Sequence, residues 1–210
     1  MDRRARLAGS RLYVVTDARD DRRDLEEFLD QILSAGVDIV QLREKEAEAG
    51  DLLRWGTVFK DAASRHGALF VVNDRPDVAV VLGADGVHLG QNDLPVEATR
   101  RLVGSDVLIG LSTHDQNQLR RASPEADYVC TGPVYETPTK EGRPPTGVGF
   151  VSFAAKYEHR PWFAIGGINE ETVSAVADAG ARRIVVVRAV TAAPDPAAAV
   201  MRLLKALPEN

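Results

Sequence analysis

Two aspartates follow neighbouring apolar runs of the sequence and could hold a metal ion. Asp74 stands just past the run Leu69–Val72, and Asp93 follows the run Gly86–Leu89 after a short polar stretch. Mg²⁺ prefers oxygen ligands and usually takes one or two protein carboxylates together with phosphate oxygens of a substrate. The alternative for Asp74 is a helix N-cap before Arg75-Pro76, because Asp and Pro suit those positions. Taken together with the neighbouring cations, Asp74 and Asp93 favour a Mg²⁺ site.

Several cations and one hydroxyl could complete a diphosphate site beside these carboxylates. Arg43 and Lys45 are two residues apart, so on an extended segment both side chains face the same side. Arg offers forked donors to a phosphate, whereas Lys offers a mobile point charge. Lys140 and Ser112 would add a third cation and a hydroxyl. The alternative for the first two is a solvated salt-bridge cluster with the glutamates beside them. Since no Ser/His/Asp or Cys/His arrangement for a covalent nucleophile is evident, a reaction with a diphosphate leaving group fits best.

A second anion site is predicted further along the chain. Gly166-Gly167 precedes a predicted helix that begins near Asn169. This pattern is typical of the phosphate site that barrels build at a helix N-terminus after their seventh and eighth strands. The Pro- and Gly-rich segment 137–147 follows the sixth apolar run and is predicted to be a lid or binding loop.

Short apolar runs alternate with helical patterns along the whole chain. Runs that are apolar throughout are typical of parallel strands covered by helices. An open doubly wound sheet is the alternative, but it would normally show G-x-G-x-x-G after its first strand, and none is present. The predicted fold is therefore α/β, a single (β/α)₈ TIM barrel over residues 1–210, with residues 1–10 as a loose N-terminal extension. The predicted strands are Leu12–Thr16, Ile39–Leu42, Leu69–Val72, Gly86–Leu89, Val107–Leu111, Tyr128–Thr131, Trp162–Ile165 and Ile184–Val187.

Composition excludes several other classes of protein. The chain has 210 residues, is 44% hydrophobic and 27% charged, and carries a formal net charge of −5, which describes an ordinary globular domain. The acidic balance argues against a nucleic acid or an anionic membrane as the main partner. The single cysteine, Cys130, cannot form an internal disulfide. We expect a cytoplasmic protein that acts on small molecules, and the sequence leaves a homo-oligomer open.

Taken together, these motifs resemble the thiamine phosphate synthase family. The resemblance runs in order from residue 11 to near the end of the chain. The matching segments are Leu12–Asp17, Gln41–Lys45, Val72–Asp74, Gly86–Asp93, Gly110–His114, Gly132–Lys140 and Ala164–Ile168.

The resemblance implies a transferase that joins 4-amino-2-methyl-5-hydroxymethylpyrimidine diphosphate to a thiazole phosphate, giving thiamine phosphate and diphosphate. In the family the pyrimidine methylene–oxygen bond breaks first, and the thiazole nitrogen captures the resulting carbocation. The resemblance places Mg²⁺ on Asp74 and Asp93 and assigns catalytic roles to Arg43, Lys45, Ser112 and Lys140. The pyrimidine diphosphate would be bound by Gln41, Leu42, Arg43, Glu44, Lys45, Asn73, Ser112 and Lys140, and the thiazole phosphate by Thr137, Pro138, Thr139, Gly167, Val187 and Arg188.

Two alternatives share the predicted fold. A related thiazole tautomerase typically carries a His in place of Pro133 and lacks the Thr-Pro-Thr-Lys run, whereas this chain keeps both synthase features. An inactive phosphate-binding barrel would not require Asp74 and Asp93, so the presence of both aspartates argues against this alternative. The family commonly shows Ser-Ala where this chain has Arg188-Ala189. Either the Arg188 guanidinium contacts the thiazole phosphate, which its position favours, or it points past the rim while backbone N–H groups bind.

Overall fold

The computed structural model describes residues 2–137 and 144–208, and within them eight parallel strands close into a barrel. Each strand pairs with the next along the chain, and the first pairs with the last. The closed ring confirms the predicted (β/α)₈ fold and excludes an open sheet, which would leave two unpaired edges. The strands are β1 (Leu12–Thr16), β2 (Ile39–Leu42), β3 (Leu69–Asn73), β4 (Gly86–Leu89), β5 (Leu108–Thr113), β6 (Tyr128–Thr131), β7 (Trp162–Ile165) and β8 (Ile184–Val186).

Five of the strands have the predicted bounds, and three differ by one or two residues at one or both ends. β3 extends to Asn73, β5 runs from Leu108 to Thr113, and β8 stops at Val186. The ladders of β3 and β5 continue past their apolar runs, since Asn73 pairs with His88 and Thr113 pairs with Thr131. Backbone pairing does not require an apolar side chain, so polar residues can occupy the last ladder positions.

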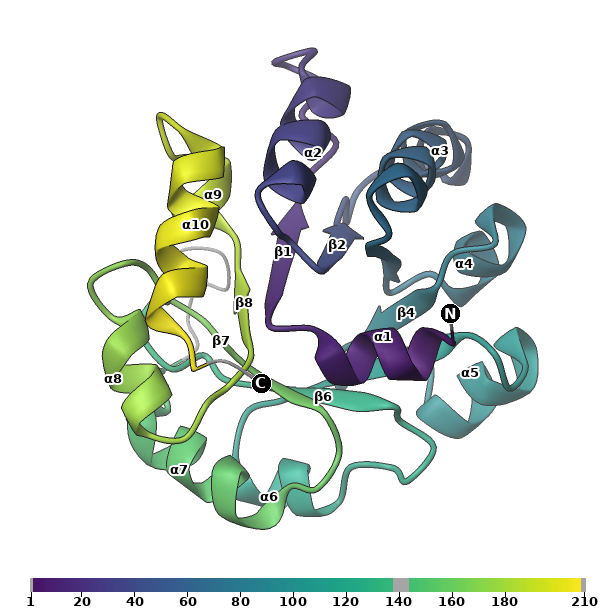
Figure 1. Cartoon of the computed structure of the whole chain (residues 1–210). Coiled ribbons are helices and arrows are strands. Elements are labelled where there is room, and N and C mark those ends of the chain that lie inside the picture. The colour runs from purple at the N-terminus through teal and green to yellow at the C-terminus, as the bar shows by residue number, and fades with distance from the viewer. Residues whose placement is uncertain (1, 138–143, 209–210) are drawn as a thin grey trace.

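Helices surround the strands and connect one to the next (Figure 1). They are α2 (Leu25–Ser34), α3 (Ala49–His66), α4 (Pro76–Leu82), α5 (Val96–Val103), α6 (Gln116–Arg120), α7 (Gly147–Tyr157), α8 (Val173–Asp178), α9 (Arg188–Thr191) and α10 (Pro196–Ala206). α3 and α4 end at Gly67 and Gly83, whose φ angles of 71° and 61° favour glycine. Among the described residues, no helix is both long and apolar enough to cross a membrane.

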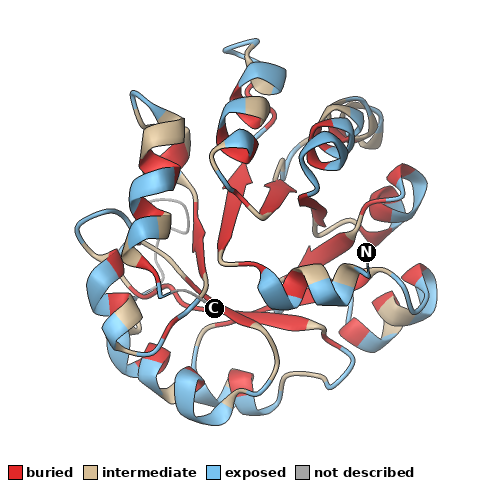
Figure 2. Ribbon diagram, in the orientation of Figure 1, coloured by how far each residue is buried: buried red, intermediate tan, exposed pale blue. Residues whose placement is uncertain are grey.

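Two hydrophobic cores lie on the two faces of the closed sheet. The barrel core fills the interior and includes Tyr13, Tyr128 and Phe163, all fully or almost fully buried. The outer core lies between strands and helices and includes Val14 and Val40. Figure 2 shows the same division, with buried residues along the strands and on the helix faces turned toward them. Successive strand residues face opposite sides, so both cores together require strands that are apolar throughout.

The N-terminal segment corrects one prediction. Instead of a loose extension over residues 1–10, Arg3–Gly9 form helix α1, which lies across the amino-terminal end of the barrel (Figure 1). Leu7, only 2% exposed, packs into the barrel core from this end. A single apolar residue on a short, Arg-rich segment gives little local signal, so its burial depends on the barrel beneath it.

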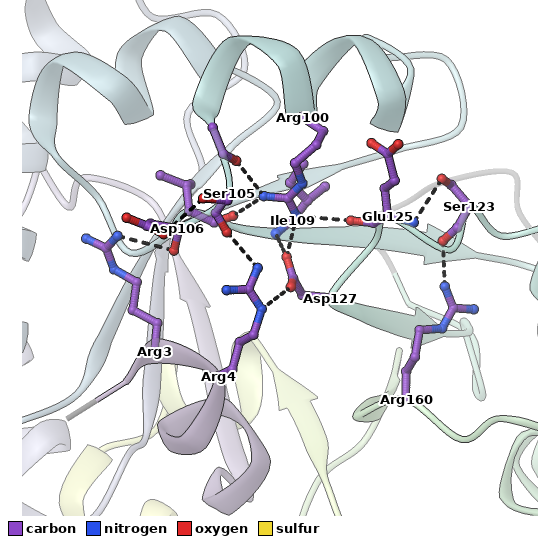
Figure 3. A network of polar contacts seen from close by, with 12 residues as sticks. Arg3, Arg4, Arg100, Ser105, Asp106, Ile109, Ser123, Glu125, Asp127 and Arg160 are labelled. Atoms are coloured by element: carbon purple, nitrogen blue, oxygen red, sulfur yellow. Dashed lines mark hydrogen bonds and ion pairs between the residues drawn. The ribbon is translucent and has the colours of Figure 1, made fainter.

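Arginines of α1 tie this helix to acidic residues that precede strands. Arg3 Nε donates to Asp85 Oδ1 at 2.9 Å. Arg4 Nε donates to Asp127 Oδ1, also at 2.9 Å (Figure 3). The second carboxylate oxygen of Asp127 accepts the N–H of Ile109 at 2.8 Å. These aspartates therefore satisfy a strand N–H and a helix cation at once, and they stand at the end of the barrel opposite the predicted site.

Candidate active site

The carboxyl end of β3 carries the first predicted metal ligand. Asp74 has a φ of 58°, a left-handed conformation that Asp adopts more readily than most residues. Its N–H donates to the carbonyl oxygen of His88 on β4 at 2.9 Å. Helix α4 begins after Arg75 without a side-chain cap, so the alternative of Asp74 as an N-cap is wrong. The second predicted ligand, Asp93, accepts the N–H of Gly90 on its Oδ2 at 2.6 Å.

The carboxyl groups of Asp74 and Asp93 interact. Burial, followed by a side-chain hydrogen bond with Asp93 and the like charge of that group, raises the pKa of Asp74 from 3.8 to about 6. Lys45 and Asn73 act in the opposite direction but less strongly. The pair is thus short of positive charge at neutral pH, and a divalent cation would supply it.

The donor set of this pair fits Mg²⁺. The residues that the structure describes hold no cluster of three or more His, Cys, Asp or Glu side chains that could bind a metal. Two carboxylates are nonetheless the usual protein share for Mg²⁺, which keeps waters and takes phosphate oxygens from its substrate. A structural zinc site would require more nitrogen or sulfur ligands than these two oxygens provide.

The two predicted cations after β2 are not used by the fold. Arg43 is half-buried and Lys45 exposed, and within the described part of the chain neither forms an ion pair. Glu44 instead accepts the N–H of Ala18 at 2.8 Å. The predicted alternative of a salt-bridge cluster is therefore wrong, and both cations remain available to an anion. The charge of Lys45 already acts on Asp74.

Residues of β2 and β3 supply further polar groups. Gln41 is 3% exposed, and its Nε2 has no hydrogen-bond partner among the described residues. It shares the inward face of β2 with Ile39 of the barrel core, so a ligand at the rim could accept this orphaned N–H. Leu42 faces the opposite way into the outer core, which leaves only its backbone for a ligand. Asn73 is half-buried at the end of β3.

Ser112 of β5 contacts a histidine of the neighbouring strand β4. It is 6% exposed, and its Oγ lies 2.9 Å from Nε2 of His88. Its carbonyl oxygen accepts from the side chain of Gln91 at 2.6 Å. Two residues further on, His114 lies with its Nδ1 2.6 Å from the carbonyl oxygen of Gly132.

A cavity of about 380 Å³ opens on the other side of the rim. Four residues predicted to surround the thiazole phosphate are on its wall, which comes from the carboxyl ends of β6, β7 and β8 and from His114. The lining residues are His114, Gly132, Pro133, Glu136, Thr137, Ile165, Gly166, Gly167, Ile168, Asn169, Val185, Val186, Val187 and Arg188.

The glycine pair shapes this wall, although the helix after it starts later than predicted. Gly166 and Gly167 have φ angles of 102° and 66°, and a Cβ on Gly167 would lie 2.6 Å from Cβ of Tyr135. The next helix begins at Val173, not near Asn169. The Asn169 side chain accepts two backbone N–H groups of a turn before α8, each at 3.0 Å, and this turn replaces the predicted first helical turn.

Comparisons with known proteins agree with the geometry. The sequence profile described as thiamine monophosphate synthase matches residues 12–190. This chain belongs to that family. A thiamine-phosphate synthase from Acidothermus cellulolyticus is 54% identical over 199 residues, covering 93% of this chain and 94% of that protein. One from Mycobacterium bovis is 52% identical over 215 residues and covers 97% of each chain.

Solved structures show the same relationship. The fold is similar to that of thiamine phosphate pyrophosphorylase from Pyrococcus furiosus, with a TM-score of 0.85, 30% identity and coverage of 97% and 96% of the two chains. A 3-hexulose-6-phosphate synthase matches with a TM-score of 0.67 at 19% identity, covering 94% of this chain and all of that one, and shows the shared barrel alone.

As a member of the thiamine monophosphate synthase family, the chain brings most of its predicted site residues to one rim. Pro138, Thr139 and Lys140 lie outside the described residues. Sequence reasoning missed His114 and His88. The alternation of side chains along a strand could have indicated both residues. His114 stands two positions after Ser112 and so points to the same side at the rim, and His88 is a polar residue within an otherwise apolar strand.

Proposed function

We propose that this chain is a transferase that joins 4-amino-2-methyl-5-hydroxymethylpyrimidine diphosphate to 4-methyl-5-(2-phosphoethyl)thiazole, or to its carboxylated tautomer, with release of diphosphate. One observation carries the proposal: a single rim holds an acidic pair beside cations that form no ion pair with any described residue and, across β5, a separate cavity of about 380 Å³. Two anionic substrates that react with each other require two such adjoining sites. The activity named for the relatives supports the same reaction.

The diphosphate binds between the acidic pair and the cations after β2. Asp74 and Asp93 hold Mg²⁺, which when bound neutralises diphosphate charge and improves it as a leaving group. Arg43 and Lys45 contact the diphosphate directly, because the fold leaves them without ion pairs of their own among the described residues. Lys140, which lies outside the described residues, adds a third cation.

The pyrimidine lies above the barrel interior, within reach of inward-facing polar groups. The orphaned Nε2 of Gln41 donates to it, and Asn73 and Ser112 complete the polar wall. The methylene–oxygen bond breaks, and its electron pair leaves with the diphosphate. The thiazole nitrogen then donates its lone pair to the methylene carbon and forms the new carbon–nitrogen bond. Arg43 and Lys45 face the negative charge that develops on the leaving oxygen, so no protein base or nucleophile is required.

The thiazole phosphate occupies the cavity. Gly167 and Val187 present backbone to it, Thr137 adds a hydroxyl, and Arg188 is the first residue of α9 on the same wall. The exposed Arg188 side chain has no ion pair within the described part of the chain, and its guanidinium contacts the phosphate. Pro138 and Thr139 complete this site in the proposal.

A direct assay tests the reaction. The purified chain should form thiamine phosphate and diphosphate in equal amounts from the two substrates, and should require Mg²⁺. Asp74→Asn should lower turnover by about a hundredfold or more, because several kcal/mol of charge stabilisation are lost. Asp77→Asn is the matched control, since Asp77 is exposed and its one ion pair among the described residues is with Arg75. Near-normal turnover of Asp74→Asn with Mg²⁺ would refute the metal assignment.

The same assay separates the alternatives. A thiazole tautomerase would isomerise the thiazole and release no diphosphate, and an inactive binding barrel would do neither. We further propose that the reaction takes place in the cytoplasm, which cell fractionation with an antibody against the chain would test.

A further inference from the structure

A line of hydrogen-bonding groups runs from the rim into the barrel core. Ser112 Oγ lies 2.9 Å from Nε2 of His88, and Nδ1 of His88 lies 3.2 Å from the Tyr128 hydroxyl. The Tyr128 hydroxyl lies 3.2 Å from that of Tyr13. The four groups come from β5, β4, β6 and β1, and these three hydrogen-bonding contacts link them in a line. We call them the core relay.

The core relay is enclosed at its inner end. Tyr13 is 1% exposed and Tyr128 is 0% exposed, and both pack edge-on against Phe163. Burial raises the pKa of both phenols well above the usual value, so each keeps its proton. Gly110 provides the space: a Cβ there would lie 2.1 Å from the Tyr128 ring and 2.5 Å from Nδ1 of His88.

The enclosed end decides which way the protons point. Among the described residues, the only hydrogen-bond partner of the Tyr13 hydroxyl is Tyr128. The thiol of Cys130 belongs to the same core but is a weak acceptor. A hydroxyl has one proton and a neutral imidazole has one N–H, so the direction chosen at one end propagates along the line.

Only one direction gives every buried proton an acceptor. If Tyr13 donates to Tyr128, then Tyr128 donates to Nδ1 of His88, and His88 donates from Nε2 to Ser112. If Nδ1 of His88 carries a proton instead, one of the two phenols loses its acceptor. A buried donor without a partner costs free energy, whereas an unused lone pair on Tyr13 costs less.

We propose that the core relay holds His88 as the Nε2–H tautomer and thereby leaves the hydroxyl proton of Ser112 free to donate into the site. His88 is thus a positioning residue that acts through Ser112, and Tyr13 and Tyr128 set its tautomer from the core. Ser112 is then suited to an acceptor atom of its ligand, either a ring nitrogen of the pyrimidine or a diphosphate oxygen. This last step rests on the proposed function, whereas the tautomer does not.

Nitrogen NMR tests the tautomer without any substrate. In ¹⁵N-His protein at pH 8, the shifts of the two ring nitrogens and their couplings to ring protons distinguish the tautomers, and His88→Gln identifies the signals. The exposed His159 is the internal reference for an unconstrained ring. We expect the ratio of Nε2–H to Nδ1–H to be about tenfold higher for His88 than for His159, given the cost of an unmade buried hydrogen bond. An Nδ1–H or doubly protonated His88 would overturn the proposal.

Kinetics test whether His88 acts through Ser112. The Gln side chain places its amide N–H where Nε2 of His stands, whereas that of Asn reaches only the Nδ1 position. Ser112→Ala and His88→Asn should each lower kcat/KM for the pyrimidine diphosphate about tenfold, the value of one hydrogen bond to a charged or polar ligand group. The double variant should be no worse than Ser112→Ala, and His88→Gln should recover most of the loss. The KM for the thiazole phosphate should not change.

The outcomes separate the two proposals. An inactive wild-type protein would refute the proposed function and leave the NMR result standing. A double variant about a hundredfold impaired would show independent effects and refute the positioning role, because coupled residues are not additive. Equal loss in His88→Gln and His88→Asn, measured on variants of similar Tm, would refute it as well.

Discussion

Removal of the charge of Asp74 should stabilise the protein at neutral pH even as it destroys the site. Burial and Asp93 raise the pKa of Asp74 from 3.8 to about 6, so between these values the folded state binds a proton that the unfolded state has lost. Stability contributed by this group is therefore lost as pH rises from about 4 to 6. Above that range, Asp74→Asn should be more stable than the wild type.

The size of the effect follows from the pKa. At about 1.4 kcal/mol per pH unit, a fully buried group with this change would contribute about 3 kcal/mol. Asp74 is only half-buried, so solvent screening reduces the expected gain of Asp74→Asn to about 1–2 kcal/mol.

Urea unfolding in EDTA at several pH values would measure the stability gained by Asp74→Asn. The free energies of unfolding of wild type and Asp74→Asn should coincide near pH 4 and diverge by about 1–2 kcal/mol at pH 8. Asp77→Asn is the control of opposite sign, because a hydrogen bond from Arg75 lowers the pKa of Asp77. Mg²⁺ should stabilise the wild type at pH 8 and not Asp74→Asn. If the difference in unfolding free energy between wild type and Asp74→Asn does not change with pH, then burial and Asp93 do not destabilise the ionised Asp74 carboxylate.

Three further substitutions test the cavity and the closed end of the barrel. Arg188→Ser should weaken thiazole phosphate binding by about 1–3 kcal/mol with no change in the KM of the pyrimidine diphosphate, and unchanged affinity would favour backbone binding. Gly167→Ala should lower both Tm and thiazole binding, since its Cβ would meet Tyr135, whereas Gly147→Ala at a similar φ of 68° has open space and should cost only about 1 kcal/mol. Leu7→Ala should cost about 2–5 kcal/mol in unfolding free energy and leave kcat unchanged, and a negligible loss in a chemical denaturation experiment would contradict the packing of α1 into the barrel.

Local patterns in the sequence were enough to predict the barrel and many of the residues at its rim. Strands apolar on both faces can only be buried between two cores, so their runs predict parallel strands nearly to the residue. Parallel strands carry their carboxyl ends to one side, so the sequence alone predicts a common rim for Asp74, Asp93, Ser112 and Gly167. The order of motifs then indicated the family.

The tertiary structure alone decided which of these residues interact and in which state. No local pattern shows that Asp74 and Asp93 interact or that Leu7 enters the barrel core. Nor does any local pattern show that Glu44 accepts a backbone N–H while Arg43 forms no ion pair with the described residues. The contact between Tyr13 and Tyr128 spans 115 positions and exists because the sheet closes. Periodicity records how each segment meets solvent, whereas pKa values, proton positions and free cations depend on atoms that only the closed barrel brings together.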